Sequence, residues 1–263
     1  MKRYISFLLV LCLLLCGCTP AVTTPPDTTG STETSQPSSE PPVTDPPVTE
    51  PPAPQHSELY IPGLSVEDVI RYFNEVCLDA EFSDGPGDAS LLQRWERPIY
   101  YELYGTYTDQ DLLMLTTFTR WLNTIPGFPG MHRAGSAADV NAEIYFCTQQ
   151  ELIDKMGSNF YGTDGAVTFW YNGNNQIFRS VICYRTDISQ FVRNSVILEE
   201  IYNGLGPVQD TDLRTDSIIY SGYSTPQELT DIDRLLLILL YHPSLSCGMT
   251  AAQCEEVIRQ LYY

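Results

Sequence analysis

Between residues 58 and 263, apolar side chains recur every three to four positions in several segments, which is the spacing of a buried helix face. Some of these segments follow a capping sequence, as in Ser65-Val66-Glu67-Asp68, where the Ser and the Asp can form a capping box. Pro226 suits the first turn of a helix, which needs no backbone N–H. The pattern predicts helices from Ser65, from Thr108, over 149–156, over about 188–205, from Thr225 and from Thr250.

The segment 98–105 alternates between apolar and polar residues, as half-buried strands do. The residue types of 142–148, 165–171 and 177–184 also favour short strands. The turn sequence Asn172-Gly173-Asn174-Asn175 separates the last two and predicts a hairpin. The order of the elements therefore predicts an α+β fold in a single domain, with a small mixed sheet, a long helix and further helices toward the C-terminus.

The N-terminal segment has the parts of a bacterial export signal. Met1-Lys2-Arg3 is followed by an apolar run over 4–15, and Leu15-Cys16-Gly17-Cys18 resembles a lipobox. A single-pass anchor is the alternative, but the run falls short of the roughly 20 residues that span a bilayer as a helix. We therefore expect a signal peptide over 1–18, with Cys18 lipidated and the protein anchored to the cell membrane outside the cytoplasm.

Residues 19–57 contain 11 Pro and 9 Thr among 39 residues. Such a composition buries too little apolar surface to fold and favours extended polyproline geometry. We expect a disordered spacer that could hold the rest of the chain up to roughly 100 Å from the membrane. The remaining residues, 58–263, are enough for one globular domain with a substantial core.

The chain is acidic, with a formal net charge of −19. Residues 58–263 contain 28 acidic and 12 basic side chains, so nucleic acid is excluded as a partner, because its binding requires clustered Lys and Arg. Five cysteines lie in this part of the chain. Export permits disulfides, with Cys247–Cys254 or Cys147–Cys183 as candidate pairs, whereas buried unpaired thiols are the alternative.

The segment 198–210 has the frame of a zinc-binding helix without its histidines. In H-E-x-x-H-x-x-G-x-x-H, two His share a helix face, the Glu is the general base, the Gly turns the chain and a third His completes the site. The corresponding positions here are Glu199, Glu200, Asn203, Gly206 and Gln209. The alternative is an ordinary amphipathic helix that ends at a glycine cap and has two solvated glutamates.

This frame resembles a degenerate metzincin motif, with Glu200 at the catalytic position and Gly206, Asp210 and Ser217 at its turns. Residues from about 95 to 249 also resemble the domain-of-unknown-function 2927 family, which implies a zincin-like fold. This second resemblance is carried by four segments: 94–99, 199–210, Leu229-Thr230-Asp231-Ile232-Asp233-Arg234-Leu235-Leu236, and 240–249. Strands with intervening helices, followed by a long motif helix, are also the order of a zincin N-terminal lobe.

The substituted positions argue against zinc chemistry. Catalytic zinc is held by three protein ligands, generally including imidazoles, and the carboxamides of Asn203 and Gln209 are poor zinc ligands. A calcium site using oxygen donors such as Glu199 and Asp210 has no recognised loop spacing. We therefore expect no metal or other cofactor. A polar network among Glu199, Glu200, Asn203 and Gln209 is expected to hold the helix to the turn at Ser217 instead.

Two functions follow from these expectations. The first is a pseudo-metallopeptidase: a non-catalytic, zincin-like surface lipoprotein that binds a protein, a peptide or a glycan outside the cell. The alternative is a peptidase-like hydrolase that uses Glu199 and Glu200 with a non-standard metal or without one. An aromatic group that includes Trp170, Tyr171 and Phe178 could line a carbohydrate or peptide groove, although such residues more commonly belong to a core.

Overall fold

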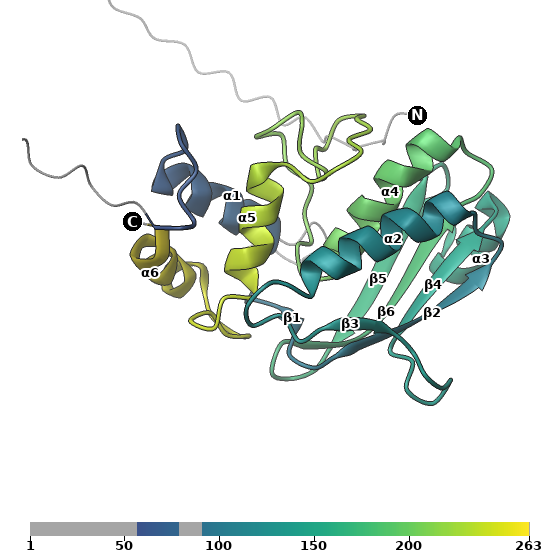
Figure 1. Cartoon of the computed structure of the whole chain (residues 1–263), viewed down its shortest axis with the longest axis horizontal. Coiled ribbons are helices and arrows are strands. Elements are labelled where there is room, and N and C mark those ends of the chain that lie inside the picture. Colours follow the sequence, from purple (N-terminus) through teal and green to yellow (C-terminus); the bar gives the residue numbers. More distant parts are fainter. Residues whose placement is uncertain (1–56, 79–90, 263) are drawn as a thin grey trace, which may run out of the picture. The chain divides into compact units, whose positions relative to one another are not determined.

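A computed structural model of the chain describes residues 57–78 and 91–262, which form a mixed α/β domain with a mostly parallel sheet (Figure 1). The predicted signal peptide, its Cys18 and residues 19–56 of the predicted spacer lie outside the described residues. Among the helices of the described residues, none is both long enough and apolar enough to cross a membrane.

The sheet has one antiparallel strand, which lies at its edge. β2, β3, β4 and β6 are mutually parallel and follow the order β6-β4-β2-β3, while β5 runs antiparallel to β6. The short β1 pairs with the start of β6. The strands are β1 (Arg94–Trp95), β2 (Ile99–Gly105), β3 (Met131–Arg133), β4 (Ala142–Cys147), β5 (Gly165–Tyr171) and β6 (Gln176–Arg185).

Three helices begin directly after the capping residues that the sequence indicates, which are Ser65, Thr108 and Thr250. Thr148, which the sequence pattern did not single out, also caps a helix, and Thr108 and Thr148 each take part in a capping box. Ser189 caps the helix that carries the motif. The helices are α1 (Val66–Leu78), α2 (Asp109–Leu122), α3 (Gln149–Met156), the 3-10 helix η1 (Ser158–Phe160), α4 (Gln190–Asn203), α5 (Asp231–Leu240) and α6 (Ala251–Tyr262).

The two faces of the sheet have different coverings. Figure 1 shows α2 and α4 side by side over one face. The main core lies beneath them, where alternate residues of β2 such as Tyr101 and Leu103 are buried. On the opposite face, α3 and η1 cover a second, smaller core around Leu152, Cys147 and Cys183. The rest of that face is here called the open face.

The predicted elements are largely confirmed, with one clear error. The helix expected from Thr225 is wrong, because Thr230 caps α5 and forms a capping box with Asp233. β1, β3 and η1 were not predicted, since segments of two or three residues are too short to show a period. The hairpin at residues 172–175 is confirmed, with Asn175 at a φ of 59°. All five cysteines of the described residues are free thiols in this structure.

Candidate functional site

The predicted motif lies at the C-terminal end of α4 and in the turn that follows it. α4 ends at Asn203, with Gly204 as its cap. Gly206 has a φ of +132°, and a Cβ on it would lie 2.5 Å from the backbone oxygen of Gln93. Only glycine fits both the backbone conformation and this close approach. The turn position in the motif frame therefore has a physical requirement for the residue found there.

Glu200 lies beneath the first residue of β5. Its side chain is directed toward Gly165, where an added Cβ would lie 2.9 Å from Cγ and 3.0 Å from Oε1 of Glu200. Glu200 is only 6% exposed. Gly165 thus admits the glutamate between α4 and the sheet, and Glu200 lies in a poor position to meet a substrate from solvent. Its neighbour Glu199 is half-buried on the same helix.

The carboxamides at two ligand positions of the frame do not build the expected network. The oxygens Oδ1 of Asn203 and Oε1 of Gln209 are buried, and neither accepts a hydrogen bond from any residue that the structure describes. The backbone N–H of Gln209 donates to the oxygen of Val76 in α1, 3.3 Å away. Asp210 follows, half-buried, in the loop. The prediction of a network among Glu199, Glu200, Asn203 and Gln209 is therefore wrong for the oxygens of Asn203 and Gln209.

Ser217 is held by α5 instead. Its Oγ donates to Oδ1 of Asp233 at 2.5 Å, and the backbone N–H of Ile218 donates to Oδ2 at 3.2 Å. The same Oδ2 accepts the backbone N–H and the hydroxyl of Thr230 through the capping box. Tyr202, the residue before Asn203, donates to the backbone oxygen of Asp233 at 3.0 Å. A polar network therefore does link α4 to this turn, but Asp233 is its centre.

A second set of contacts, here called the clasp, joins the ends of α4 and α5. Trp95 Nε1 donates to the oxygen of Gly204 at 2.9 Å, and the Tyr241 hydroxyl donates to the oxygen of Leu205 at 2.8 Å. Both oxygens belong to the end of α4, where carbonyls lack helical partners. Arg94 donates to the oxygen of Leu240 at 2.5 Å at the end of α5.

These contacts explain what the family-like segments do in the structure. Four residues of the segments that carry the resemblance form hydrogen bonds with buried backbone groups: Arg94, Trp95, Asp233 and Tyr241. No local sequence pattern indicates these roles, because the backbone groups that the side chains meet lie far away along the chain. For Asp233, a local signal was present in the capping box Thr230-x-x-Asp233.

β5 is an edge strand beside the motif helix. It pairs with β6 along one side, and no other segment of the described residues forms backbone hydrogen bonds along its other side. Its exposure increases along the strand, from buried Gly165 to Trp170, which is 40% exposed, and Tyr171, which is 52% exposed. An unpaired edge offers backbone N–H and C=O groups to another extended chain.

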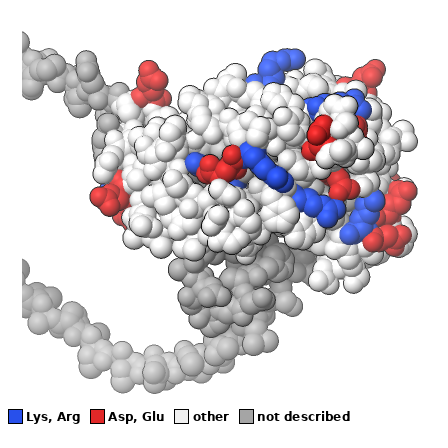
Figure 2. All heavy atoms as spheres, turned by 90° about the horizontal axis from the view of Figure 1, so that it is seen from below, with Lys and Arg blue, Asp and Glu red and all other residues white. Residues whose placement is uncertain are grey.

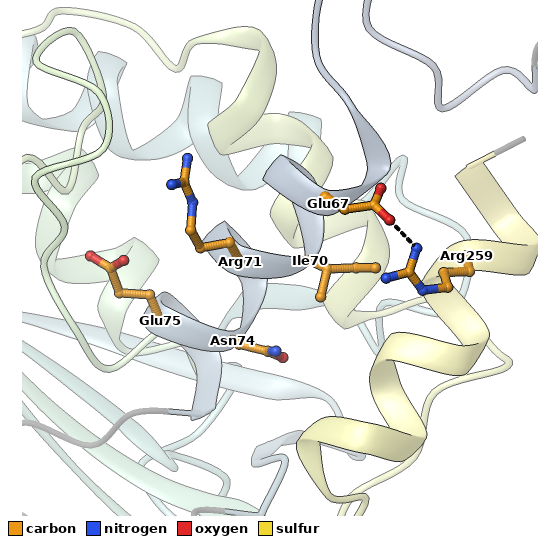
Figure 3. Close-up of a pocket in the computed structure, with 6 residues that line it drawn as sticks. All are labelled: Glu67, Ile70, Arg71, Asn74, Glu75 and Arg259. Carbon is orange, nitrogen blue, oxygen red and sulfur yellow. Dashed lines mark hydrogen bonds and ion pairs between the residues drawn. The ribbon is translucent and has the colours of Figure 1, made fainter. Parts of the chain in front are cut away.

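A separate hollow lies between α1 and α6, with a volume of about 410 Å³ (Figure 3). Its charged lining is balanced, and Glu67 forms an ion pair with Arg259 at 2.5 Å that joins the two helices. The lining residues are Glu67, Ile70, Arg71, Asn74, Glu75 and Arg259. None of the predicted motif positions lines it.

The two histidines of the described residues are apart from the motif. His132 is exposed on β3, and His242 follows α5, where burial and then the nearby Arg94 lower its pKa. No three or more His, Cys, Asp or Glu side chains within residues 57–78 and 91–262 form a group that could hold a metal ion.

The fold and these contacts define a mixed α/β domain. The segments that carry the family resemblance meet at the ends of α4 and α5. The family model described as "Protein of unknown function (DUF2927)" matches residues 66–260, and the chain belongs to this family. The match begins at the first residue of α1, includes all the strands of the described residues and ends within α6. No curated protein matches the chain.

Proposed function

We propose that this protein is a non-catalytic, zincin-like lipoprotein that binds an extended peptide segment along β5, outside the cytoplasm. In this proposal, lipid on Cys18 anchors the protein to the membrane, and residues 19–57 separate the domain from it. The observation that carries the binding function is the unpaired edge of β5, because an extended peptide can add to such an edge as a further strand.

The zincin-like part of the proposal is supported by the order and direction of the elements. A mostly parallel sheet ends in a hairpin whose first strand, β5, is the antiparallel edge, and the next helix, α4, contains the motif frame. α4 packs beneath β5, so that Gly165 meets Glu200 and Gly204 meets Val167. The positive φ of Gly206 supports the turn position of the frame.

The non-catalytic part is supported by the chemistry of the frame. Carboxamides occupy two of the three positions at which a zinc helix has imidazoles. The glutamate at the general-base position is nearly fully buried under β5. A peptide lying along the outer edge of β5 would be bound through its backbone, with specificity coming from side-chain contacts near Trp170 and Tyr171.

Selection of peptides from a random phage-displayed library against the purified full-length protein tests the proposal. Selected peptides should protect alternate backbone amides of β5 from hydrogen exchange, and N-methylation of alternate peptide bonds should abolish binding because it removes the donors that pair with the strand. The Glu200→Gln protein should bind the same peptides equally well.

Two results would contradict this function. Peptides that bind without protecting β5 amides would remove the strand-addition mechanism. Cleavage of peptides by the purified protein, lost in Glu200→Gln and accompanied by stoichiometric metal in elemental analysis, would favour the hydrolase alternative. The full-length Tyr223→Ala protein is a suitable control for both assays, since Tyr223 is 67% exposed in a loop away from the sheet.

A further inference from the structure

The open face of the sheet carries a row-by-row arrangement of aromatic and charged side chains. The strand register places Glu102 beside Glu143, and Tyr104 beside Tyr145. Arg179 of β6 lies opposite Trp170 of β5. Tyr100, Tyr104 and Trp170 are each more than a third exposed. We call this set the platform: Tyr100, Glu102, Tyr104, Arg133, Glu143, Tyr145, Lys155, Trp170 and Arg179.

The rings of the platform are held in fixed positions. Tyr104 and Tyr145 stack with their centroids 4.7 Å apart, and Nζ of Lys155 lies 3.7 Å from the centroid of Tyr145. Cζ of Arg179 lies 4.8 Å from the centroid of the Trp170 ring. Because each ring has a neighbour on one side, little side-chain freedom remains to be lost when a ligand stacks on it.

The carboxylates of the platform are also fixed. Glu143 accepts hydrogen bonds from the Tyr145 hydroxyl at 2.7 Å and from Arg179 at 2.8 Å. Glu102 accepts the backbone N–H of Leu103 and an N–H of Arg133, both at 3.0 Å. The Leu103 hydrogen bond, followed by that from Arg133, lowers the pKa of Glu102, so this carboxylate remains ionised at neutral pH.

The charge of the platform differs from that of the domain around it. The platform has three basic side chains, Arg133, Arg179 and Lys155, and two acidic ones, Glu102 and Glu143, whereas residues 58–263 as a whole contain 28 acidic and 12 basic side chains. Figure 2 shows basic and acidic side chains alternating in a band across the side of the molecule that is seen from below, opposite α2 and α4 in Figure 1. The platform therefore repels neither a neutral ligand nor a weakly acidic one.

We propose that the platform binds a glycan, with sugar rings stacked on Tyr104 and Trp170 and sugar hydroxyls hydrogen-bonded to the Glu–Arg pairs. A sugar has apolar C–H faces that suit exposed rings, and its hydroxyls both donate to carboxylates and accept from guanidinium groups. A protein partner fits less well, because it would bury two ion pairs whose desolvation opposes binding, and interface cores are depleted in charged residues.

A printed array of neutral and acidic glycans, probed with the purified full-length protein, tests this inference. Glycans that bind should also change the intrinsic tryptophan fluorescence, because Trp170 is exposed while Trp95 is 1% exposed. Tyr104→Ala should weaken binding at least tenfold, and Trp170→Phe should remove the fluorescence change. Tyr223→Ala, which removes a more exposed tyrosine in a loop, should bind as the unmodified protein does.

Three results would overturn the glycan inference. These are no binding to any glycan on the array, binding that Tyr104→Ala leaves unchanged, or capture of a folded protein through the platform without glycan binding. Circular dichroism of Tyr104→Ala keeps a loss of binding interpretable, since an exposed tyrosine should be removable without unfolding. The peptide function of β5 is tested separately, because Tyr104→Ala should bind the selected peptides normally.

Discussion

Asp233 is fully buried, and its carboxylate accepts hydrogen bonds from Ser217, Ile218 and Thr230. One residue thus starts α5 and fixes the turn that follows α4. The motif frame led us to expect this role at Glu199, Asn203 and Gln209. A side chain that meets backbone donors 15 or more residues away leaves no pattern in its own neighbourhood, and only its part in the capping box could be predicted from sequence.

We predict that Asp233→Ala lowers the free energy of unfolding by about 2–5 kcal/mol, because several buried donors lose their acceptor at once. Asp231→Ala is the matched control, since Asp231 lies two residues earlier on the same helix and its side chain is 51% exposed. The control should change stability by less than about 1 kcal/mol. Urea denaturation of the two variants measures the difference, and equal effects would refute the role of Asp233.

Asp111 gives a pH-dependent prediction. Burial acts to raise its pKa, but hydrogen bonds from Arg193, from the backbone of Thr108 and from Gln190 outweigh this and lower the pKa. A carboxyl whose folded pKa is lowered stabilises the fold above its unfolded pKa of about 3.9, and this stability is lost as the pH falls through the folded value.

We therefore expect the free energy of unfolding to fall as the pH drops from about 5 to 3, and to fall less steeply in Asp111→Asn. That variant should also be less stable at pH 6, because Arg193 is buried and loses its charged partner. Asp109→Asn is the control, since Asp109 lies two residues earlier on the same helix and is exposed. Identical pH slopes for Asp111→Asn and the unmodified protein would count against the prediction.

At the scale of elements, the helices and the longer strands could be predicted because caps and periodicity are local. Ser65 and Thr108 indicated the starts of α1 and α2, and the turn at residues 172–175 indicated the hairpin of β5 and β6. The start of α5 was misplaced because Pro226 offered a plausible first turn. The sheet order and the open face could not be predicted, since strand neighbours are set by packing between distant segments.

The motif frame at the end of α4 can be tested by introducing histidines at its three ligand positions. If α4 and the turn at Gly206 have a zincin-like arrangement, Glu199→His, Asn203→His and Gln209→His together should create a zinc site. We expect the triple variant to bind one zinc ion and the unmodified protein to bind zinc much more weakly, as isothermal titration would show. A folded triple variant without zinc affinity would reject the zincin-like arrangement. The double variant lacking Gln209→His is the control, because two ligands bind zinc weakly.

At the scale of the whole molecule, the proposed function depends on the segments outside the described residues. An extended spacer of Pro and Thr would allow β5 and the open face to reach partners away from the membrane. Both proposed binding surfaces belong to one domain, and Trp170 of β5 contributes to each. A protein held by one lipid and offering two surfaces could connect a peptide to a glycan.

The lipid anchor is tested by Cys18→Ala. If Cys18 is acylated after export, membrane retention requires this cysteine, so the variant should be released from the membrane fraction. Cys12→Ala is the control, because Cys12 lies inside the apolar run of the predicted signal peptide. Unchanged membrane attachment of Cys18→Ala would contradict lipidation at this residue.

The clasp has a consequence for how the chain folds. Trp95 meets Gly204 across 109 residues, and Arg94 meets Leu240 across 146 residues. Contacts of such long sequence separation slow folding, because loop closure must precede the gain from each contact. The donors to the carbonyls at the end of α4 come from both sides of this helix in the sequence, Trp95 before it and Tyr241 after it. A polypeptide built in this way should reach its native state more slowly than one of equal length whose contacts are local.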